Sequence, residues 1–151
     1  MRLVAVILTI SLGISLNALA QSDEESVKHV INNLFDGMRN ADSASVRQCF
    51  HADARLQTVL KNQAVKLRVG EESVNNFVRM IGMPHEKIYD ERIKFDMIQI
   101  DGDLAVAWTP YSFYIGSDFS HCGVNAFQLV RTEKGWKILS IIDTRRKDNC
   151  R

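Results

Sequence analysis

Several features that carry chemistry in other proteins are missing from this sequence. It has no C-x-x-C pair, no glycine-rich phosphate loop and no recognisable Ser-His-Asp triad. Its four histidines, His29, His51, His85 and His121, are too scattered along the chain to suggest a metal site. The sequence therefore indicates neither a metal nor a cofactor.

An excess of one charge is also missing. The chain has 19 Lys and Arg against 18 Asp and Glu. Arg2 is the only charged residue among the first 20, so the remainder carries 18 of each sign. Nucleic-acid binding requires a basic surface patch. We therefore expect no nucleic-acid partner.

The longest apolar run is too short for a stable membrane span. It extends from Leu3 to Leu16, after the positive start Met1-Arg2, and small residues in an A-x-A arrangement precede Gln21. This pattern predicts a secretory signal, residues 1–20, cleaved after Ala20, and one domain over residues 21–151. A membrane anchor is the alternative. We expect a secreted, periplasmic protein without membrane contact after cleavage.

Three cysteines remain in an exported chain, where a disulfide is permissible. We favour a Cys122–Cys150 bridge, which would tie the C-terminal tail to a hairpin. Cys49 lies in an apolar helical context and is expected to be a buried free thiol. The other pairings stay open.

Helices are expected early in the chain. Ser22 and Glu25 form a capping box, and an apolar stripe at steps of three and four then predicts a helix ending near Asn40. Asp42 or Ser43 can cap a second, short helix. A third begins at residues 71–73 and ends at Gly82.

Strands follow, because apolar and polar residues alternate in short runs. Early strands are expected at Arg55–Leu60 and near residues 65–69, and the chain reads as strands from Ile88 onward. Asp101-Gly102 marks a tight turn. Pro110 cannot donate to a sheet and predicts a bulge or an edge segment. Val124–Arg131 and Trp136–Asp143 form a final β-hairpin around Gly135. Helices followed by strands indicate the α+β class.

The order of elements and several motifs resemble the nuclear transport factor 2-like superfamily, also called SnoaL-like or cystatin-like. The matching segments are the first helix, the step Phe50–Ala54, the turn Asp101–Asp103, Phe127–Val130 and Gly135–Ile138. The resemblance implies a strongly curved, mostly antiparallel sheet wrapped around N-terminal helices, forming a cone with an internal cavity. Some members are isomerases, dehydratases or cyclases, and others only bind ligands. The resemblance also implies a possible homodimer through the open sheet face.

Alternation along the hairpin sorts its candidate residues. If Arg131 opposes Trp136, then His121 and Asn125 share a face with Thr144 and Arg146. That face is apolar at the turn end and polar at the other end, as in a small-molecule pocket. His121 is the candidate acid or base, with a structural histidine as the alternative. Asn125 is a candidate ligand-binding residue that could donate a hydrogen bond to a developing oxyanion, with a contact at a bulge or a ladder end as the alternative.

Other residues are candidates on weaker grounds. Asp143 and Arg145 share the second face and are expected to form a surface salt bridge, with an anion clamp by Arg145 or Arg146 as the alternative. The aromatic side chains of Trp108, Tyr111 and Tyr114 are candidates for the cavity wall, although strand aromatics are more often core residues.

The sequence therefore leaves two functions open. The leading prediction is a secreted protein that binds a small, partly apolar ligand in the cone cavity. The alternative is an isomerase, dehydratase or cyclase in which His121 transfers a proton next to a carbonyl.

Overall fold

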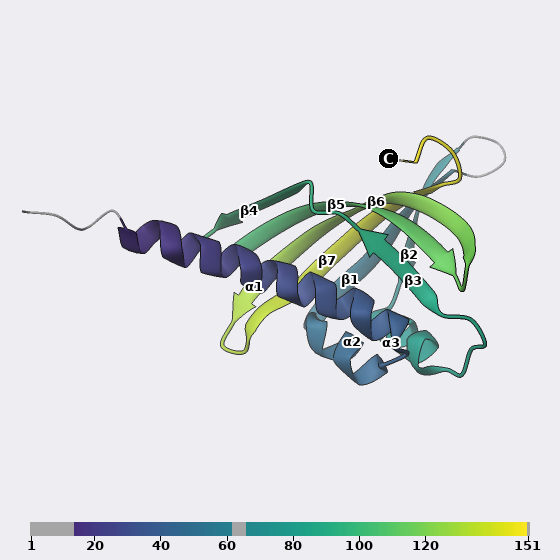
Figure 1. The fold of residues 1–151 in the computed structure, drawn as a ribbon, viewed down its shortest axis with the longest axis horizontal. Coiled ribbons are helices and arrows are strands. Elements are labelled where there is room, and N and C mark those ends of the chain that lie inside the picture. Colours follow the sequence, from purple (N-terminus) through teal and green to yellow (C-terminus); the bar gives the residue numbers. More distant parts are fainter. Residues whose placement is uncertain (1–13, 62–65, 151) are drawn as a thin grey trace, which may run out of the picture.

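The computed structural model describes residues 14–61 and 66–150. It shows a long helix, α1 (Ile14–Arg39), crossing one side of a curved sheet, with α2 (Ser43–Cys49) and α3 (Val74–Gly82) near the C-terminal end of α1 (Figure 1). The seven strands are β1 (Phe50–Lys61), β2 (Leu67–Glu72), β3 (Tyr89–Ile93), β4 (Met97–Asp101), β5 (Leu104–Ile115), β6 (Asp118–Thr132) and β7 (Gly135–Arg146). The predicted α+β class and curved sheet are confirmed.

The sheet has the order β2-β1-β7-β6-β5-β3, and β4 also pairs with β5. All pairs are antiparallel except β1 with β7. This parallel pair joins the early strands to the late hairpin. It therefore makes one continuous sheet from two segments far apart in the chain.

The apolar stripe of α1 packs into the core as its spacing predicts. Val27, Ile31 and Leu34 are almost fully buried, and the helix ends at Arg39. The predicted N-cap at Ser22 is wrong, because α1 already begins at Ile14 and continues through this position. The predicted signal segment begins outside the described residues, and its cleavage after Ala20 remains a prediction.

Side-chain caps begin the two short helices. Asp42 caps α2 by accepting a 3.0 Å hydrogen bond from the backbone N–H of Ser45. Ser73 caps α3 by accepting one from Asn76. Between the two alternatives for α2, the structure therefore selects Asp42.

Pro110 lies inside the regular pairing of β5 with β6, so the predicted irregularity is not on that side of β5. On the other side of β5, the partner changes from β4, which pairs up to Trp108, to β3, which begins pairing at Tyr111. Pro110 lies at this change of partner. Its carbonyl accepts a hydrogen bond from Lys94 N in the connecting segment.

One extra residue in β7 changes which side chains face the helices. Arg131 opposes Trp136, as predicted, and Leu129 opposes Ile138. The register then shifts, so that Gln128 opposes Ser140 rather than Leu139. Beyond this bulge, every β7 side chain lies on the face opposite to the predicted one.

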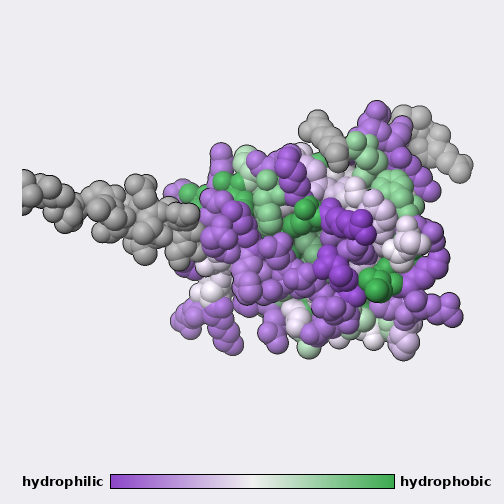
Figure 2. Space-filling view, in the orientation of Figure 1, coloured by the Kyte–Doolittle hydropathy of each residue, from purple (hydrophilic) through white to green (hydrophobic). Residues whose placement is uncertain are grey.

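The core lies between α1 and the concave face of the sheet. Phe127, Leu129 and Ile138 contribute fully buried side chains from β6 and β7, and Phe35 of α1 meets Phe127 edge to face. The outer surface on the α1 side is mostly hydrophilic, with separate hydrophobic areas (Figure 2). Within the described residues, no helix is long and apolar enough to cross a membrane.

Candidate functional site

A cavity of about 490 Å³ opens between the concave sheet face and the helices α1 and α3. Its wall combines apolar side chains with a small group of polar ones. The apolar residues include Met38, Leu56, Phe77, Ile81, Phe113 and Ile141, and the polar ones include Thr58, Glu91, Tyr111, His121, Asp143 and Arg145. Its size is that of typical small-molecule pockets.

A row of polar side chains crosses the sheet behind this cavity. Thr58 opposes Asp143, Asp143 opposes Asn125, and Asn125 opposes Thr109, on four neighbouring strands. Opposed residues project from the same face of a sheet. Thr109 is fully buried, and its hydroxyl has no hydrogen-bond partner among the described residues. The row therefore places four polar side chains next to an otherwise apolar core.

Asp143 is the hub of this row. Its carboxylate accepts hydrogen bonds from Thr58 Oγ1 at 2.5 Å and from Arg145 Nε at 2.8 Å. The Tyr111 hydroxyl lies 3.3 Å from the same carboxylate. Asp143 is 8% exposed, so these contacts replace water around the buried charge. The predicted Asp143–Arg145 salt bridge is confirmed, and it lies at the cavity with the Arg145 side chain 52% exposed.

Tyr111 reaches this hub because β6 has a glycine beneath the ring. A Cβ atom added to Gly123 would lie 2.8 Å from Tyr111 Cε1 and would collide with the Thr144 carbonyl. The Tyr111 hydroxyl donates to that carbonyl at 3.0 Å. Burial, then the neighbouring carboxylates Asp143 and Glu91, raise the pKa of Tyr111. Its proton is thus directed at the protein rather than at the cavity.

Glu91 is the least expected member of the site. It is half-buried on β3 and accepts a 2.7 Å hydrogen bond from Asn125 Nδ2 at Oε1. Burial raises the pKa of Glu91 to about 7, since the Asn125 bond and the Arg145 charge offset only part of the cost of removing a carboxylate from water. Near neutral pH the carboxyl can therefore hold or lose a proton.

His121 lies across Phe113 from Glu91, because Phe113 opposes His121 on one side and Glu91 on the other. The imidazole contacts the rings of Phe113 and Tyr111, with centroids 5.1 Å and 5.7 Å away. Burial, together with the positive charge of Arg145, lowers the pKa of His121. Its Nδ1 pairs with Ser120 Oγ at 3.0 Å, which leaves Nε2 as the ring nitrogen that a ligand can reach.

The structure thus brings together some predicted site residues and separates others. His121 and Tyr111 line the cavity, and Asn125 lies behind Glu91. Thr144 and Arg146 do not lie on the sheet face of His121 and Asn125. The prediction that they do is wrong, because the β7 bulge turns both to the convex side. Arg146 Nε instead donates to the Asn149 carbonyl.

Two predicted aromatic residues also lie outside the cavity wall. Trp108 is 43% exposed and opposes Met97 and Ala126 on the convex face. Tyr114 packs against Phe119 and beneath the Arg92 guanidinium. Neither side chain lines the cavity.

Sequence reasoning missed Glu91 and Thr58. Glu91 stands between Tyr89 and Ile93 in an alternating run, so a glutamate on an apolar strand face was the available signal. Thr58 carried no comparable signal, because only the parallel β1–β7 pairing brings it to Asp143.

Cys122 and Cys150 are joined, with sulfur atoms 2.02 Å apart, and Cys49 is a buried free thiol. The bridge fastens the C-terminal tail to β6 on the convex side. Burial raises the pKa of Cys49 to about 11, so this thiol stays protonated near neutral pH.

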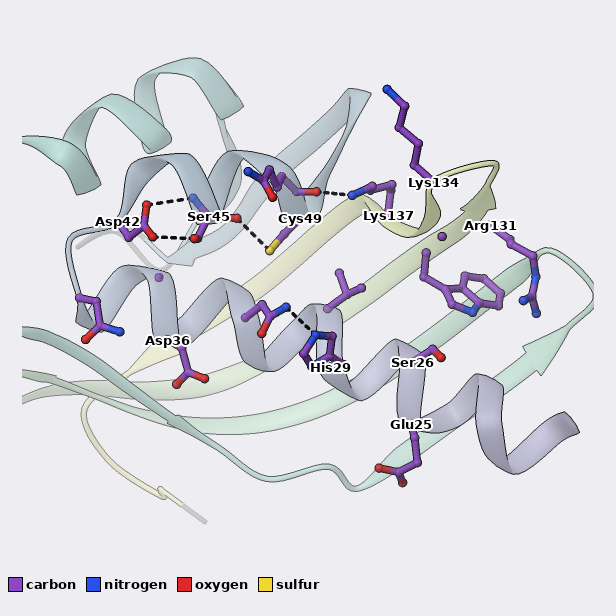
Figure 3. Close-up of a pocket in the computed structure, with 17 residues that line it drawn as sticks. Glu25, Ser26, His29, Asp36, Asp42, Ser45, Cys49, Arg131, Lys134 and Lys137 are labelled. Atoms are coloured by element: carbon purple, nitrogen blue, oxygen red, sulfur yellow. Dashed lines mark hydrogen bonds between the residues drawn. The ribbon is translucent and has the colours of Figure 1, made fainter. Parts of the chain in front are cut away.

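A larger depression of about 850 Å³ lies between α1, α2 and the β6–β7 turn (Figure 3). Its polar groups are largely satisfied by one another. His29 pairs with Asn33, Asp42 with Ser45, and Lys137 with the Gln48 carbonyl. We therefore place the candidate site in the smaller cavity, where the buried titratable groups gather. The described part of the chain contains no cluster of His, Cys, Asp and Glu suited to a metal ion.

A curved sheet around a long helix, with a cavity between them, defines the nuclear transport factor 2-like, cystatin-like class. Comparison with known families and structures supports this assignment. The family model described as "Putative lumazine-binding" matches residues 22–142, and the chain belongs to this family. No curated protein matches the chain in sequence.

Solved structures with this fold are similar in shape but distant in sequence. An NTF2-like protein with a cystatin-like fold from Novosphingobium aromaticivorans has a TM-score of 0.71 and 11% identity, over 90% of each chain. An NTF2-like protein of unknown function from Shewanella baltica has a TM-score of 0.62 and 19% identity, over 85% of this chain and 97% of that one. A structure from Streptomyces avermitilis, described as a "putative dehydratase" of the NTF2-like family, has a TM-score of 0.62 and 16% identity, over 84% and 98%.

Proposed function

We propose that this protein binds a small, partly apolar ligand in the cavity between the sheet and α1. The observation that carries the proposal is the cavity itself, with an apolar wall and polar groups gathered at Glu91, His121 and Asp143. Such a combination binds the body of a ligand by burial and orients it by a few hydrogen bonds. The description of the family as lumazine-binding supports a flat heteroaromatic ligand.

Native mass spectrometry on protein purified from its own host tests the proposal. We expect a co-purifying small molecule, or saturable binding of added lumazine followed by its fluorescence. His121→Ala removes one side of the cavity wall and should weaken binding. His29→Ala is the matched control, because His29 is exposed on α1 outside this cavity. An empty wild-type protein that binds no lumazine would contradict the proposal.

A second candidate function is proton transfer next to a carbonyl, as in isomerisation, dehydration or cyclisation. The specific observation is that His121 and Glu91 flank Phe113 at the cavity, with Nε2 of a largely neutral imidazole on one side. The Streptomyces avermitilis neighbour described as a dehydratase supports it. NMR-detected deuterium exchange α to the carbonyl of cyclic ketones would test it. Exchange by wild type that His121→Ala abolishes is expected, and exchange unchanged in that variant would contradict it.

Export is the second part of the proposal. The pattern of residues 1–20 and the Cys122–Cys150 bridge both suit an oxidising compartment such as the periplasm. The expected product is a periplasmic protein that starts at Gln21, as measured by intact-mass spectrometry of a periplasmic extract. A chain retained with residues 1–20 in the membrane fraction would contradict it.

The convex sheet face supports a homodimer. Met97, Leu104 and Trp108 are each more than 40% exposed on β4 and β5. A second copy of the same face can cover these residues about a two-fold axis, because such an interface is self-complementary.

A further inference from the structure

The cavity wall bears an imbalance of charge that restricts its ligand. Among the described residues around it, Glu71, Glu72, Glu91 and Asp143 are acidic, and His121 and Arg145 carry the basic groups. The Arg145 Nε hydrogen is already donated to Asp143. Arg55 donates to both Glu71 oxygens, and Thr58 and Arg145 occupy the two Asp143 oxygens. Among the described residues, Glu72 and Glu91 are therefore the carboxylates of the wall with one oxygen left for a ligand.

Glu91 is the acceptor best placed to accept a hydrogen bond from a ligand. Asn125 donates a 2.7 Å hydrogen bond to Oε1, which fixes the carboxyl from behind, and no donor to Oε2 is found among the described residues. Asn125 itself is 5% exposed and absent from the cavity wall. The Glu91 carboxyl is therefore held in place through Oε1, while Oε2 is available to a ligand.

We propose that the cavity selects ligands that donate an N–H hydrogen bond to the Glu91 carboxylate, such as heteroaromatic rings with a free ring N–H. This inference rests on the proposed function, since it names the ligand class of the same cavity. The apolar walls from α1 and α3, including Met38 and Phe77, hold the ring faces. A charged acceptor binds an N–H more strongly than a neutral acceptor does.

Binding of ligands that donate an N–H depends on the protonation state of Glu91. The carboxyl has a pKa of about 7, and an N–H donor binds the ionised form. Affinity therefore rises as pH increases through this value and then levels off. The described groups that interact electrostatically with Glu91 are Tyr111 on β5 and Asp143 and Arg145 on β7. His121 on β6 and the acidic Glu71 and Glu72 on β2 line the same cavity, while α1 and α3 present apolar side chains. Burial lowers the pKa of His121 and raises that of Tyr111, which moves both titrations away from that of Glu91.

The experiment compares two probes of nearly equal shape, lumazine and 1,3-dimethyllumazine, which carries methyl groups in place of both ring N–H hydrogens. Wild type should bind lumazine about ten-fold or more tightly. Glu91→Leu should bind both probes about equally. Glu91→Gln should lose the rise of affinity around pH 7. Glu133→Gln, in the exposed β6–β7 turn, is the matched control and should behave as wild type.

The outcomes separate this inference from the proposed function. If both probes bind wild type with equal affinity, the cavity binds ligands but Glu91 does not select them, and the inference is overturned. If neither probe binds, the proposed function fails for this ligand class and the inference fails with it. Thermal unfolding confirms that each variant is folded. Glu91→Gln keeps an acceptor for the buried Asn125 amide and is expected to fold as wild type does, whereas Glu91→Leu leaves that donor unpaired and should be less stable.

Discussion

The ring of Tyr111 lies against the bare backbone of Gly123. A Cβ atom at position 123 would stand 2.8 Å from Tyr111 Cε1. This contact lets the Tyr111 hydroxyl reach the Thr144 carbonyl on the next strand, 3.0 Å away. A glycine on β6 therefore sets the position of a cavity residue on β5.

Gly123→Ala should destabilise the protein. The added methyl group meets the Thr144 backbone as well as the Tyr111 ring, and a central strand cannot easily move away. We expect a loss of about 1–3 kcal/mol in the free energy of unfolding, measured by urea denaturation. Gly70→Ala on β2 is the control, because its new Cβ would have an ordinary 3.5 Å contact with Leu60. Equal stability of the two variants would refute the steric explanation.

Asp143→Ala should also be destabilising. It removes the acceptor for Thr58 and Arg145 from a buried position, at an expected cost of about 1–3 kcal/mol. A double-mutant cycle with Thr58→Val should show coupling of about 0.5–3 kcal/mol, since both residues share one hydrogen bond. Asp53→Ala, whose side chain is 85% exposed, should change stability by less than about 0.5 kcal/mol. Additive effects at positions 58 and 143 would argue against the hydrogen bond.

Stability should depend on pH through Glu91. The pKa of this carboxyl rises from its ordinary value of 4.5 to about 7 on folding. Between these values the folded chain binds more protons than the unfolded chain, so the free energy of unfolding falls as pH rises. The shift corresponds to at most about 3 kcal/mol.

Urea unfolding of wild type and Glu91→Gln at a series of pH values measures this effect. The difference between the two proteins should change steadily from about pH 4.5 to about pH 7 and remain constant above it. Parallel curves over this window would mean that Glu91 titrates normally in the folded protein.

Trp108→Glu should disrupt the proposed dimer. The substitution places a charge in the centre of the exposed apolar side chains of β4 and β5, next to Met97. Sedimentation at micromolar concentration should give a dimer for wild type and a monomer for this variant. Lys134→Glu, in the exposed β6–β7 turn, is the control and should remain dimeric. A monomeric wild-type protein would show that this face does not mediate self-association.

Local patterns in the sequence determined the core-facing side of α1, though not its start, and the turn end of the final hairpin. The stripe of α1 and the pairing of Arg131 with Trp136 depend on residues close together in the chain. Their spacing alone was sufficient, because helical and strand periods fix which side chains share a face. The class of fold followed from the order of these elements.

Only the tertiary structure decided the composition of the cavity wall. Alternation specifies a face until one extra residue enters a strand, and the β7 bulge exchanged Thr144 and Arg146 for Asp143 and Arg145. The Thr58–Asp143 contact joins residues 85 apart, through a parallel pairing that no local pattern encodes. The polarity of the site was therefore present in the sequence, but its orientation depended on long-range strand pairing.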